Sequence, residues 1–299
     1  MTTATATPET RAASAADASA EAMRFVQELA AEVNEGPIEL PSYPEVALRV
    51  QRVLADSNAD VTRVVKVIGG EPVLASRIIT MANSAALNPS GKPATELREA
   101  VSRVGFDALR SAAIGFAVAQ LRKAAAYRSI EKPMTVLWQQ NVATAATCFV
   151  LARKLKRFAP DTAMLAGLVS GVGKLYILTR SSQFPALFGD ADSYHSIVRE
   201  WHPNVARSLL ENWGMADEII DAVAGFEDAG KDEHARVTLA DVLGGASLLV
   251  DLRHTPDLLA ARLQQDHAAA RLGLTMAVCD ELLAESAAEV TALREALGH

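Results

Sequence analysis

The sequence predicts an all-α protein in which an N-terminal helical bundle packs on a second helical bundle, with further helices at the C-terminus. Ala, Leu, Val, Glu and Arg dominate the composition, which favours helix over sheet. Apolar residues recur at helical spacing, and no convincing run alternates as a strand does. The 299 residues suffice for one large or two medium domains with a sizeable core.

The charge balance argues against nucleic acid as a partner. The chain has 29 Lys and Arg residues against 36 Asp and Glu residues, which gives a formal net charge of −7 at pH 7. Because affinity for DNA and RNA depends largely on neutralising phosphates, an acidic chain is a poor general binder of either. We therefore expect no nucleic-acid partner.

The cysteines and the apolar runs indicate a cytoplasmic protein with no membrane partner. Cys148 and Cys279 both lie in apolar helical context, so we expect buried thiols, and two cysteines form no zinc pattern or disulfide framework. The N-terminus lacks the segments of a secretory signal. The longest charge-free run, Pro133 to Ala152, contains Gln, Asn and Thr residues, so we predict an internal helix there.

The first residues are expected to form a disordered tail. Residues 1–20 are Ala, Thr and Ser with almost no large apolar side chains, so they bury too little surface to offset the entropy of ordering. Glu21 to Val33 has apolar residues at helical spacing, and Asn34-Glu35-Gly36-Pro37 stops that helix.

Further helices are predicted up to residue 121, each with a recognisable start. Pro44 and Pro72 suit first helical turns, and Asp60 and Thr95 are N-cap residues. Gly105 separates the last two helices. The predicted helices cover residues 44–54, 61–68, 72–82, 95–104 and 107–121.

The rest of the chain continues as helices with short connections. Trp201-His202-Pro203 is predicted to start a helix, because Pro favours the first turn. A loop is expected from Phe188 to Tyr194, and a charged link from Glu227 to Glu233. Two or three helices are expected over 235–297. The other predicted helices cover residues 134–157, 161–179, 201–213 and 217–225.

Four stretches between residues 40 and 226 occur in a characteristic order and spacing. They are Leu40-Pro41-Ser42-Tyr43-Pro44-Glu45-Val46; Glu71 to Ala85; Leu97 to Arg110; and a last group of Leu137 to Asn141, Ala166 to Leu175 and His202 to Gly214. Together they resemble the HDOD family, the HD-related output domain of bacterial signalling proteins. The resemblance implies an HDOD domain over 21–230, with an N-terminal half (21–130), an HD-like half (131–230) and a C-terminal helical extension (231–299).

The stretch from Ala166 to Leu175 resembles the central helix of the HD superfamily of metal-dependent phosphohydrolases, where a His-Asp pair binds metal. The matching positions here are Ser170 and Gly171; glycine has no side-chain ligand, and a lone hydroxyl is a poor one. The resemblance places further site positions at Gln140, His202, Phe226 and Glu227, and weakly at Asp241. Only His202 keeps a histidine, so the implied HD-like bundle is degenerate, with no catalytic residue, metal or cofactor.

Three polar residues near this stretch leave alternatives open. Lys174 lacks the glycine spacing of a phosphate loop, so it snorkels or pairs with a carboxylate, or it contacts an anionic ligand in the degenerate pocket. His202 is either a cap or packed residue at a helix start, or a ligand. His195 is expected to be solvated.

Other polar clusters favour structural roles. Asn83-Ser84 satisfies helix carbonyls or fixes the junction between the two halves. The basic pairs Arg122-Lys123, Arg153-Lys154 and Lys156-Arg157 complement helix dipoles, with an anion-binding or partner-docking patch as the alternative. Any surplus apolar face after Ala235 would be an interface, and a homodimer is one alternative.

The resemblance implies a non-catalytic cytoplasmic module of signal transduction, an output or adaptor protein that acts through contacts with other signalling proteins. Two alternatives remain open. One is a sensor that binds a nucleotide second messenger in the degenerate pocket, and the other is a divergent metal-dependent phosphohydrolase.

Overall fold

The computed structural model describes residues 8–36, 38–40, 44–56, 58–83, 87–88, 91–228 and 236–297. Within these residues every regular element is a helix and none is a strand, which confirms the predicted all-α class.

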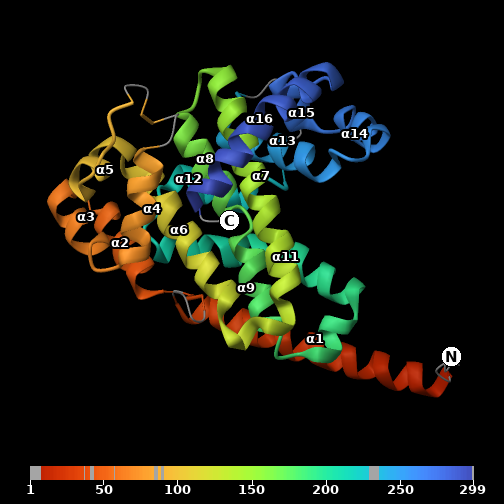
Figure 1. The fold of residues 1–299 in the computed structure, drawn as a ribbon. Helices are drawn as coiled ribbons and strands as arrows, with labels where there is room; N and C mark the ends of the chain where they lie inside the picture. The colour runs from red at the N-terminus through yellow and green to blue at the C-terminus, as the bar shows by residue number, and fades with distance from the viewer. Residues whose placement is uncertain are drawn as a thin grey trace, which may run out of the picture.

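An N-terminal unit has an apolar core of its own. Its helices are α2 (Glu45–Ala55), α3 (Val61–Ile68), α4 (Pro72–Ala82), α5 (Leu97–Val104) and α6 (Phe106–Lys123). Val50, Ile68, Ile78 and Val101 lie in this core, at the helical spacing visible in the sequence. Figure 1 shows α2 to α5 side by side, with α6 running from them into the rest of the molecule.

A second, larger core joins the remaining elements. These are α1 (Pro8–Glu35), the 3₁₀ helix η1 (Ala125–Ile130), α7 (Glu131–Leu155), α8 (Pro160–Val169), α9 (Val172–Ser181), α10 (Pro185–Gly189), α11 (Ala191–Asn212), α12 (Asp217–Gly225), α13 (Leu239–Leu252), α14 (Pro256–Leu263), α15 (His267–Leu272) and α16 (Met276–Leu297). The central helix is α7, which packs on α8, α13 and α16. Because α6 contributes Ile114 and Leu121 to this core, it couples the two units.

The first helix differs from its prediction in extent and in position. It begins at Pro8, so the tail predicted to be disordered is helical from Pro8 onward, and residues 1–7 lie outside the described residues. The tail was predicted to be disordered because it lacks large apolar side chains. Alanine, which is abundant there, has the highest helix propensity and favours a helix without them. The helix packs on α10 and α11, and its Phe25 and Leu29 belong to the second core and not to the core of the N-terminal unit. Figure 1 shows the start of α1 projecting beyond the body.

Polar contacts hold α1 in that position. Glu21 accepts hydrogen bonds from the backbone N–H groups of Ala186 (2.8 Å) and Leu187 (3.1 Å), at the start of α10. Glu32 accepts one from the hydroxyl of Tyr176 (2.6 Å) and pairs with Arg180 on α9.

Three further boundaries correct the predictions. The helix predicted over 161–179 breaks at Ser170-Gly171 into α8 and α9, and the loop predicted from Phe188 to Tyr194 is mostly helical. His202 lies inside α11, with Pro203 tolerated in the helix interior, so it does not start a helix. Four helices, not two or three, follow residue 236, because Gly, Pro and Asp residues divide the apolar stretch into short pieces.

The C-terminal helices are integrated into the second core, and α16 also packs on α4 and α6. Lys154 pairs with Glu281 (3.0 Å) and Glu285 (2.8 Å) of α16, and Arg153 lies 3.5 Å from Glu289. This basic pair at the end of α7 therefore joins two helices. A truncation after residue 226 would expose core residues of α7 and α8.

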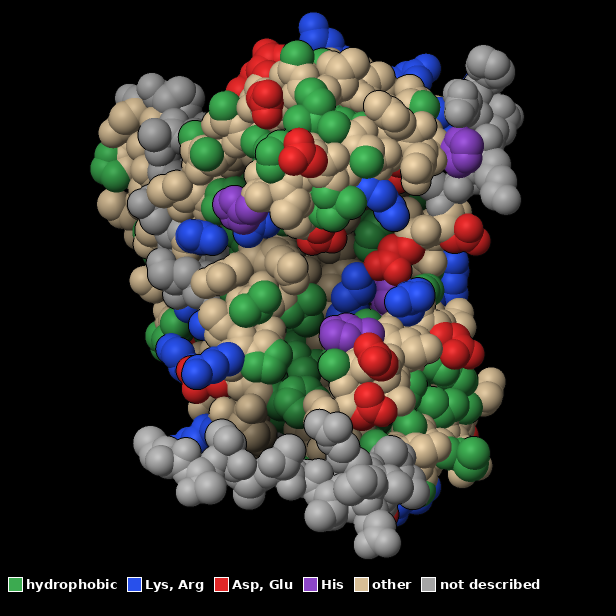
Figure 2. All heavy atoms as spheres, turned by 90° about the vertical axis from the view of Figure 1, so that its right-hand side faces the viewer, with side chains coloured by type: hydrophobic (Ala, Val, Ile, Leu, Met, Phe, Trp, Pro, Cys, Tyr) green, Lys and Arg blue, Asp and Glu red, His purple; other side chains and the backbone are tan. Residues whose placement is uncertain are grey.

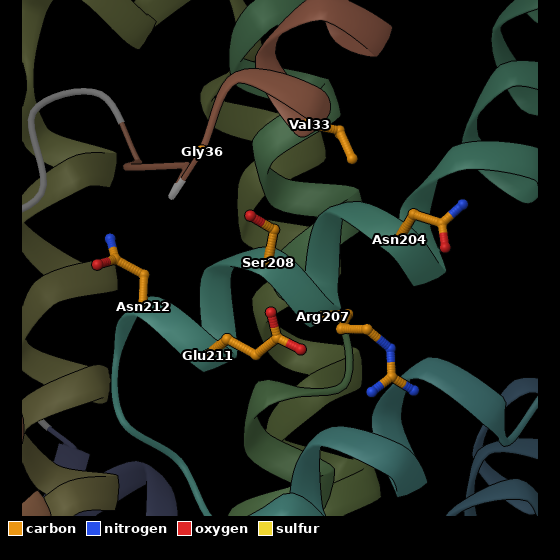
Figure 3. A pocket seen from close by; sticks show the side chains of 7 residues that line it. All are labelled: Val33, Gly36, Asn204, Arg207, Ser208, Glu211 and Asn212. Atoms are coloured by element: carbon orange, nitrogen blue, oxygen red, sulfur yellow. The ribbon is translucent and has the colours of Figure 1, made fainter.

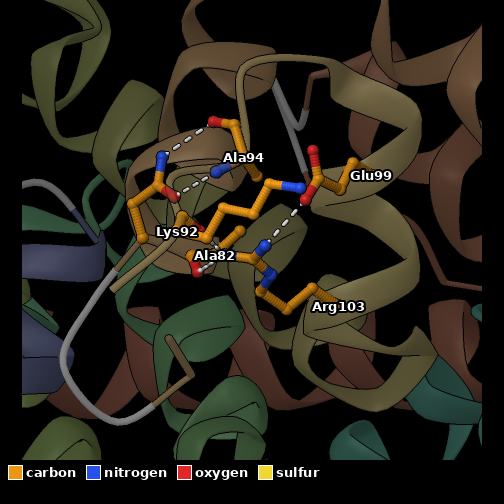
Figure 4. Close-up of polar contacts among 6 residues, drawn as sticks. Ala82, Lys92, Ala94, Glu99 and Arg103 are labelled. Carbon is orange, nitrogen blue, oxygen red and sulfur yellow. Dashed lines mark hydrogen bonds and ion pairs between the residues drawn. The ribbon is translucent and has the colours of Figure 1, made fainter. Parts of the chain in front are cut away.

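Asn83 has a structural role inside the N-terminal unit, close to the contacts of Ala94 and Arg103 that Figure 4 labels. Its side-chain amide donates to the carbonyl of Ala94 (2.9 Å) and accepts from the N–H of Ala94 (2.7 Å). Arg103 donates to the carbonyl of Lys92 (3.0 Å) and pairs with Glu99 (2.7 Å). Asn83 thus closes the connection from α4 to α5, and it does not fix the junction between the halves; Ser84 lies outside the described residues.

Among the described residues one helical segment is long and apolar enough to cross a membrane, and a second qualifies only if a bent pair of helices is counted as one span. Pro160–Ser181 reaches a mean hydropathy of 1.4, but 89% of that window is buried inside the fold, as in the core helix of a globular protein. Leu97–Val104 and Phe106–Lys123 pass the same test only as a pair, and the pair is bent by 108°.

Candidate functional site

Glycines in α8 and α9 bring neighbouring helices into close contact. A Cβ on Gly167 would lie 2.6 Å from the Cα of Ala145 on α7, far inside the normal contact distance. A Cβ on Gly173 would overlap the carbonyl oxygen of His202 and lie 3.1 Å from the N of Ala206, both on α11. The close backbone approach expected for this small-residue stretch is confirmed: α8 packs closely on α7, and α9 packs closely on α11.

The cavity has a volume of about 260 Å³. It is bounded by α7, the break between α8 and α9, the end of α12, and α13. Six of the site positions predicted from the sequence line it, namely Gln140, Ser170, Gly171, Lys174, Phe226 and Glu227. His202 and the weakly matched Asp241 do not line it, but Nε2 of His202 lies 2.8 Å from the carboxylate of Glu227.

An ion-pair network occupies one side of the cavity. The Nζ of Lys174 lies 2.7 Å from Oε1 of Glu227, and Nε2 of His202 lies 2.8 Å from Oε2 of the same carboxylate. The ammonium group of Lys174 also lies 5.9 Å from the centre of the Phe226 ring, within cation–π distance. Both oxygens of Glu227 are therefore engaged by protein groups.

The network determines the charge of Glu227. Desolvation by burial would raise the pKa of this carboxyl, but the contact with His202 and the positive charge of Lys174 outweigh it and lower the pKa to about 2. Glu227 is thus a carboxylate at any physiological pH. At Asp251, on the cavity rim, desolvation raises the pKa, and the charge of Lys174 opposes that shift.

Each of the polar residues singled out in the sequence has a defined place in the structure. Lys174 pairs with a carboxylate, and His202 is a packed histidine, with its side chain 1% exposed and its ring 6.4 Å from that of Phe226. His195 is exposed on α11, as predicted. Asp241 lies outside the cavity lining; it caps α13 in a capping box with Thr238 and pairs with Arg271.

The side chains present do not fit a metal centre of the HD type. Such a centre needs several His and Asp or Glu ligands converging on one or two cations. Among the described residues there is no group of three or more His, Cys, Asp or Glu side chains able to hold a metal ion. In addition, Lys174 places a positive charge in the cavity, at the carboxylate that would otherwise attract a cation.

Five further residues of the cavity lining are not among the site positions predicted from the sequence, namely Leu137, Asn141, Thr144, Ser247 and Asp251. Leu137, Asn141 and Thr144 share one face of α7 with Gln140, so their helical spacing from Gln140 was a usable signal. Ser247 and Asp251 are one turn apart on α13, and nothing local indicates that α13 faces this cavity.

A different cavity, of about 640 Å³, lies where α1 meets α11 (Figure 3). Its polar side chains mainly anchor the chain that leaves α1. Ser208 accepts a hydrogen bond from the N–H of Ile38 (3.4 Å), and Asn212 donates to the carbonyl of Ile38 (3.1 Å). Arg207 pairs with Asp221 of α12 at 2.9 Å. These contacts give the 640 Å³ cavity a structural explanation.

The face of the molecule in Figure 2 carries acidic and basic side chains interspersed, without a continuous field of one sign. A phosphate backbone would need such a basic field.

Comparison with known proteins gives one family and several structures of the same fold. The model of the HDOD domain matches residues 40–229. A protein of Shewanella amazonensis SB2B, named as a metal-dependent phosphohydrolase, is 27% identical with a TM-score of 0.66, over 91% of this chain and 99% of that chain. The comparison with curated proteins finds no match.

Two further structures share the fold. An HDOD domain protein of unknown function from Geobacter sulfurreducens is 21% identical with a TM-score of 0.60, over 93% of this chain and 97% of that chain. A protein of Marinobacter aquaeolei VT8, named as a signal transduction protein, is 22% identical with a TM-score of 0.57, over 94% of this chain and 66% of that chain.

Proposed function

The chain belongs to the HDOD family, and from this premise we propose that it is a non-catalytic output or adaptor module of bacterial signal transduction that acts by binding other proteins. The observation that carries the proposal is the set of side chains in the cavity of about 260 Å³ that the HD-like positions line, hereafter the HD-like cavity. Ser170 and Gly171 replace the His-Asp pair, and Lys174 and His202 engage both oxygens of Glu227. Such a cavity offers no ligand set with which to activate water on a metal.

Binding suits the surface of the molecule. Five large apolar side chains are exposed among the described residues, each on a different helix. They are Met23 on α1, Val73 on α4, Val136 on α7, Phe188 on α10 and Leu258 on α14. Scattered exposed residues are normal for soluble proteins, so they name no single docking face. We further propose a cytoplasmic location, because both cysteines are free and buried.

The test is capture of partners from the native cell with the full-length chain, followed by binding measurements with each purified candidate. We expect at least one partner to bind saturably, with the same affinity in EDTA and with the Glu227→Gln variant. If no captured protein binds when purified, or if binding requires a divalent metal, the proposal fails.

A divergent phosphohydrolase is the rival, favoured by the name of the Shewanella structure. An assay of phosphodiester hydrolysis distinguishes the phosphohydrolase from the adaptor. Hydrolysis of bis-(p-nitrophenyl) phosphate in the presence of Mn²⁺, abolished by Glu227→Gln but not by Asp221→Asn on the surface of α12, would favour the rival.

A further inference from the structure

The HD-like cavity contains hydrogen-bonding groups that the protein itself leaves unused. The side chain of Thr144 is buried, with the residue 5% exposed, and it lines the cavity. Among the described residues its hydroxyl has no hydrogen-bond partner, and neither does the side-chain amide of Asn141, one turn earlier on α7. Thr144 and Asn141 therefore present to the cavity a hydroxyl and an amide that no protein group occupies, and both are available to a polar ligand.

The replacement at Gly171 shapes the same part of the cavity. A Cβ at this position would lie 2.6 Å from Nδ2 of Asn141, so the amide of Asn141 rests in space that any other residue would fill. The loss of a metal ligand at position 171 therefore does more than remove a ligand. It lets an amide, with one donor and one acceptor edge, face the cavity beside Thr144.

The charge of the lining disfavours an anion. One ammonium, of Lys174, and two carboxylates, of Glu227 and Asp251, line the cavity. Because Glu227 already neutralises Lys174 at 2.7 Å, the remaining formal charge is that of Asp251. A phosphate group brought into this cavity would meet a negative charge and no uncommitted cation among its lining residues.

Size and shape limit the ligand further. Pockets for drug-sized ligands start at roughly 300 Å³, so a cavity of about 260 Å³ suits a small molecule and is too small for a dinucleotide. Leu137 and Phe226 add apolar wall, which suits the face of a flat ring. The carboxamides of Gln140 and Asn141 match a ring whose edge alternates donors and acceptors.

We propose that this cavity binds an uncharged planar heterocycle of nucleobase size, held by Thr144 and Asn141, and that it excludes the corresponding phosphorylated nucleotides. The inference does not rest on the proposed function, because a partner-binding module and an enzyme are both compatible with a small ligand here. It narrows the ligand class by charge and size, and it assigns roles to two residues of α7 outside the HD-like positions.

The test is binding of adenine, hypoxanthine and uracil, each compared with AMP, IMP and UMP, by thermal shift and isothermal titration calorimetry on the full chain. We expect at least one base to raise the melting temperature in a saturable way, and its monophosphate to bind at least about ten-fold more weakly. Thr144→Val keeps the side-chain shape and removes the hydroxyl, so it should weaken base binding by about ten-fold.

Thr147→Val is the matched control. Thr147 is also buried on α7, but its hydroxyl donates to the carbonyl of Ala143 (2.9 Å) and it does not line the cavity. The control should bind the base as the unmodified chain does. The proposal is overturned if none of the three bases binds at millimolar concentration, if a monophosphate binds more tightly than its base, or if the two valine variants bind equally well. Partner capture uses none of these probes, so its failure is distinguishable.

Discussion

Gly167→Ala tests whether helix contact distances in the second core depend on missing side chains. The added Cβ would lie 2.6 Å from Cα and 2.7 Å from N of Ala145, and both atoms belong to the backbone of α7. Carbon atoms in contact prefer about 3.5–4.0 Å, so α7 and α8 would have to separate by about 1 Å. Overpacking costs about 1–3 kcal/mol, and a clash with backbone atoms, which cannot rotate away, places this site in the upper part of that range, at about 2–3 kcal/mol. The gain in helix propensity on replacing Gly by Ala offsets about 1 kcal/mol.

We therefore expect a net loss of about 1–2 kcal/mol in the free energy of unfolding, measured by chemical denaturation followed by circular dichroism. The melting temperature should fall by about 2–3 °C, since an unfolding entropy of about 2.1 cal/mol/K per residue gives about 0.6 kcal/mol per degree for 299 residues. Gly189→Ala is the control, because a Cβ on Gly189 would meet nothing within 4 Å. Equal stability of Gly167→Ala and the unmodified chain would refute the close-packing account.

Three further predictions follow from polar groups. Glu227→Gln should lower the free energy of unfolding by about 1 kcal/mol near pH 7, a value discounted because the Glu227 side chain is 37% exposed. Because the pKa of Glu227 is lowered from 4.5 to about 2 in the folded chain, this contribution should be lost as the pH falls from about 4.5 to 2. Denaturation curves of the two proteins that stay apart at pH 2 would contradict this prediction. Asp241→Asn should lower the free energy of unfolding by about 3–5 kcal/mol, because the side chains of Asp241 and its partner Arg271 are only 3% and 5% exposed. Asp221→Asn, at an exposed pair, should lower it by less than about 1 kcal/mol. The reverse order of the two variants in urea denaturation would count against this reasoning. Burial raises the pKa of the Cys148 thiol, and that of Cys279 to about 11, so neither should react with a disulfide reagent until the chain unfolds, and rapid native labelling would disprove this.

The helices themselves were largely predictable because their signals are local. Asp60 caps α3 as expected, with its side chain accepting from the N–H of Arg63, and Pro72 occupies the first turn of α4. Pro203 misled the prediction, since proline usually starts a helix, yet here it lies in the interior of α11. The start of α1 was missed because Ala-rich segments show propensity without an apolar stripe.

The composition of the site was only partly predictable because it depends on contacts between distant helices. Gly173 and Lys174 could be matched to a family motif, but the pairing of Lys174 with Glu227 spans 53 residues. Asp251 enters the cavity only because α13 packs on α7 and α12, an arrangement with no local signal. The break at Ser170-Gly171 was not predicted, because it interrupts a continuous apolar stretch whose pattern indicates one helix.

The central claim is that an ion pair, and not a metal centre, occupies the HD-like cavity. Its most direct test is the metal content of the full-length protein, measured by elemental analysis after incubation with Mn²⁺, Fe²⁺, Ni²⁺ and Zn²⁺ and removal of free ions. The account predicts far less than one metal per chain, with no difference between the unmodified protein and Glu227→Gln. One or two tightly held metals per chain, lost in Glu227→Gln and retained in Asp221→Asn, would contradict it.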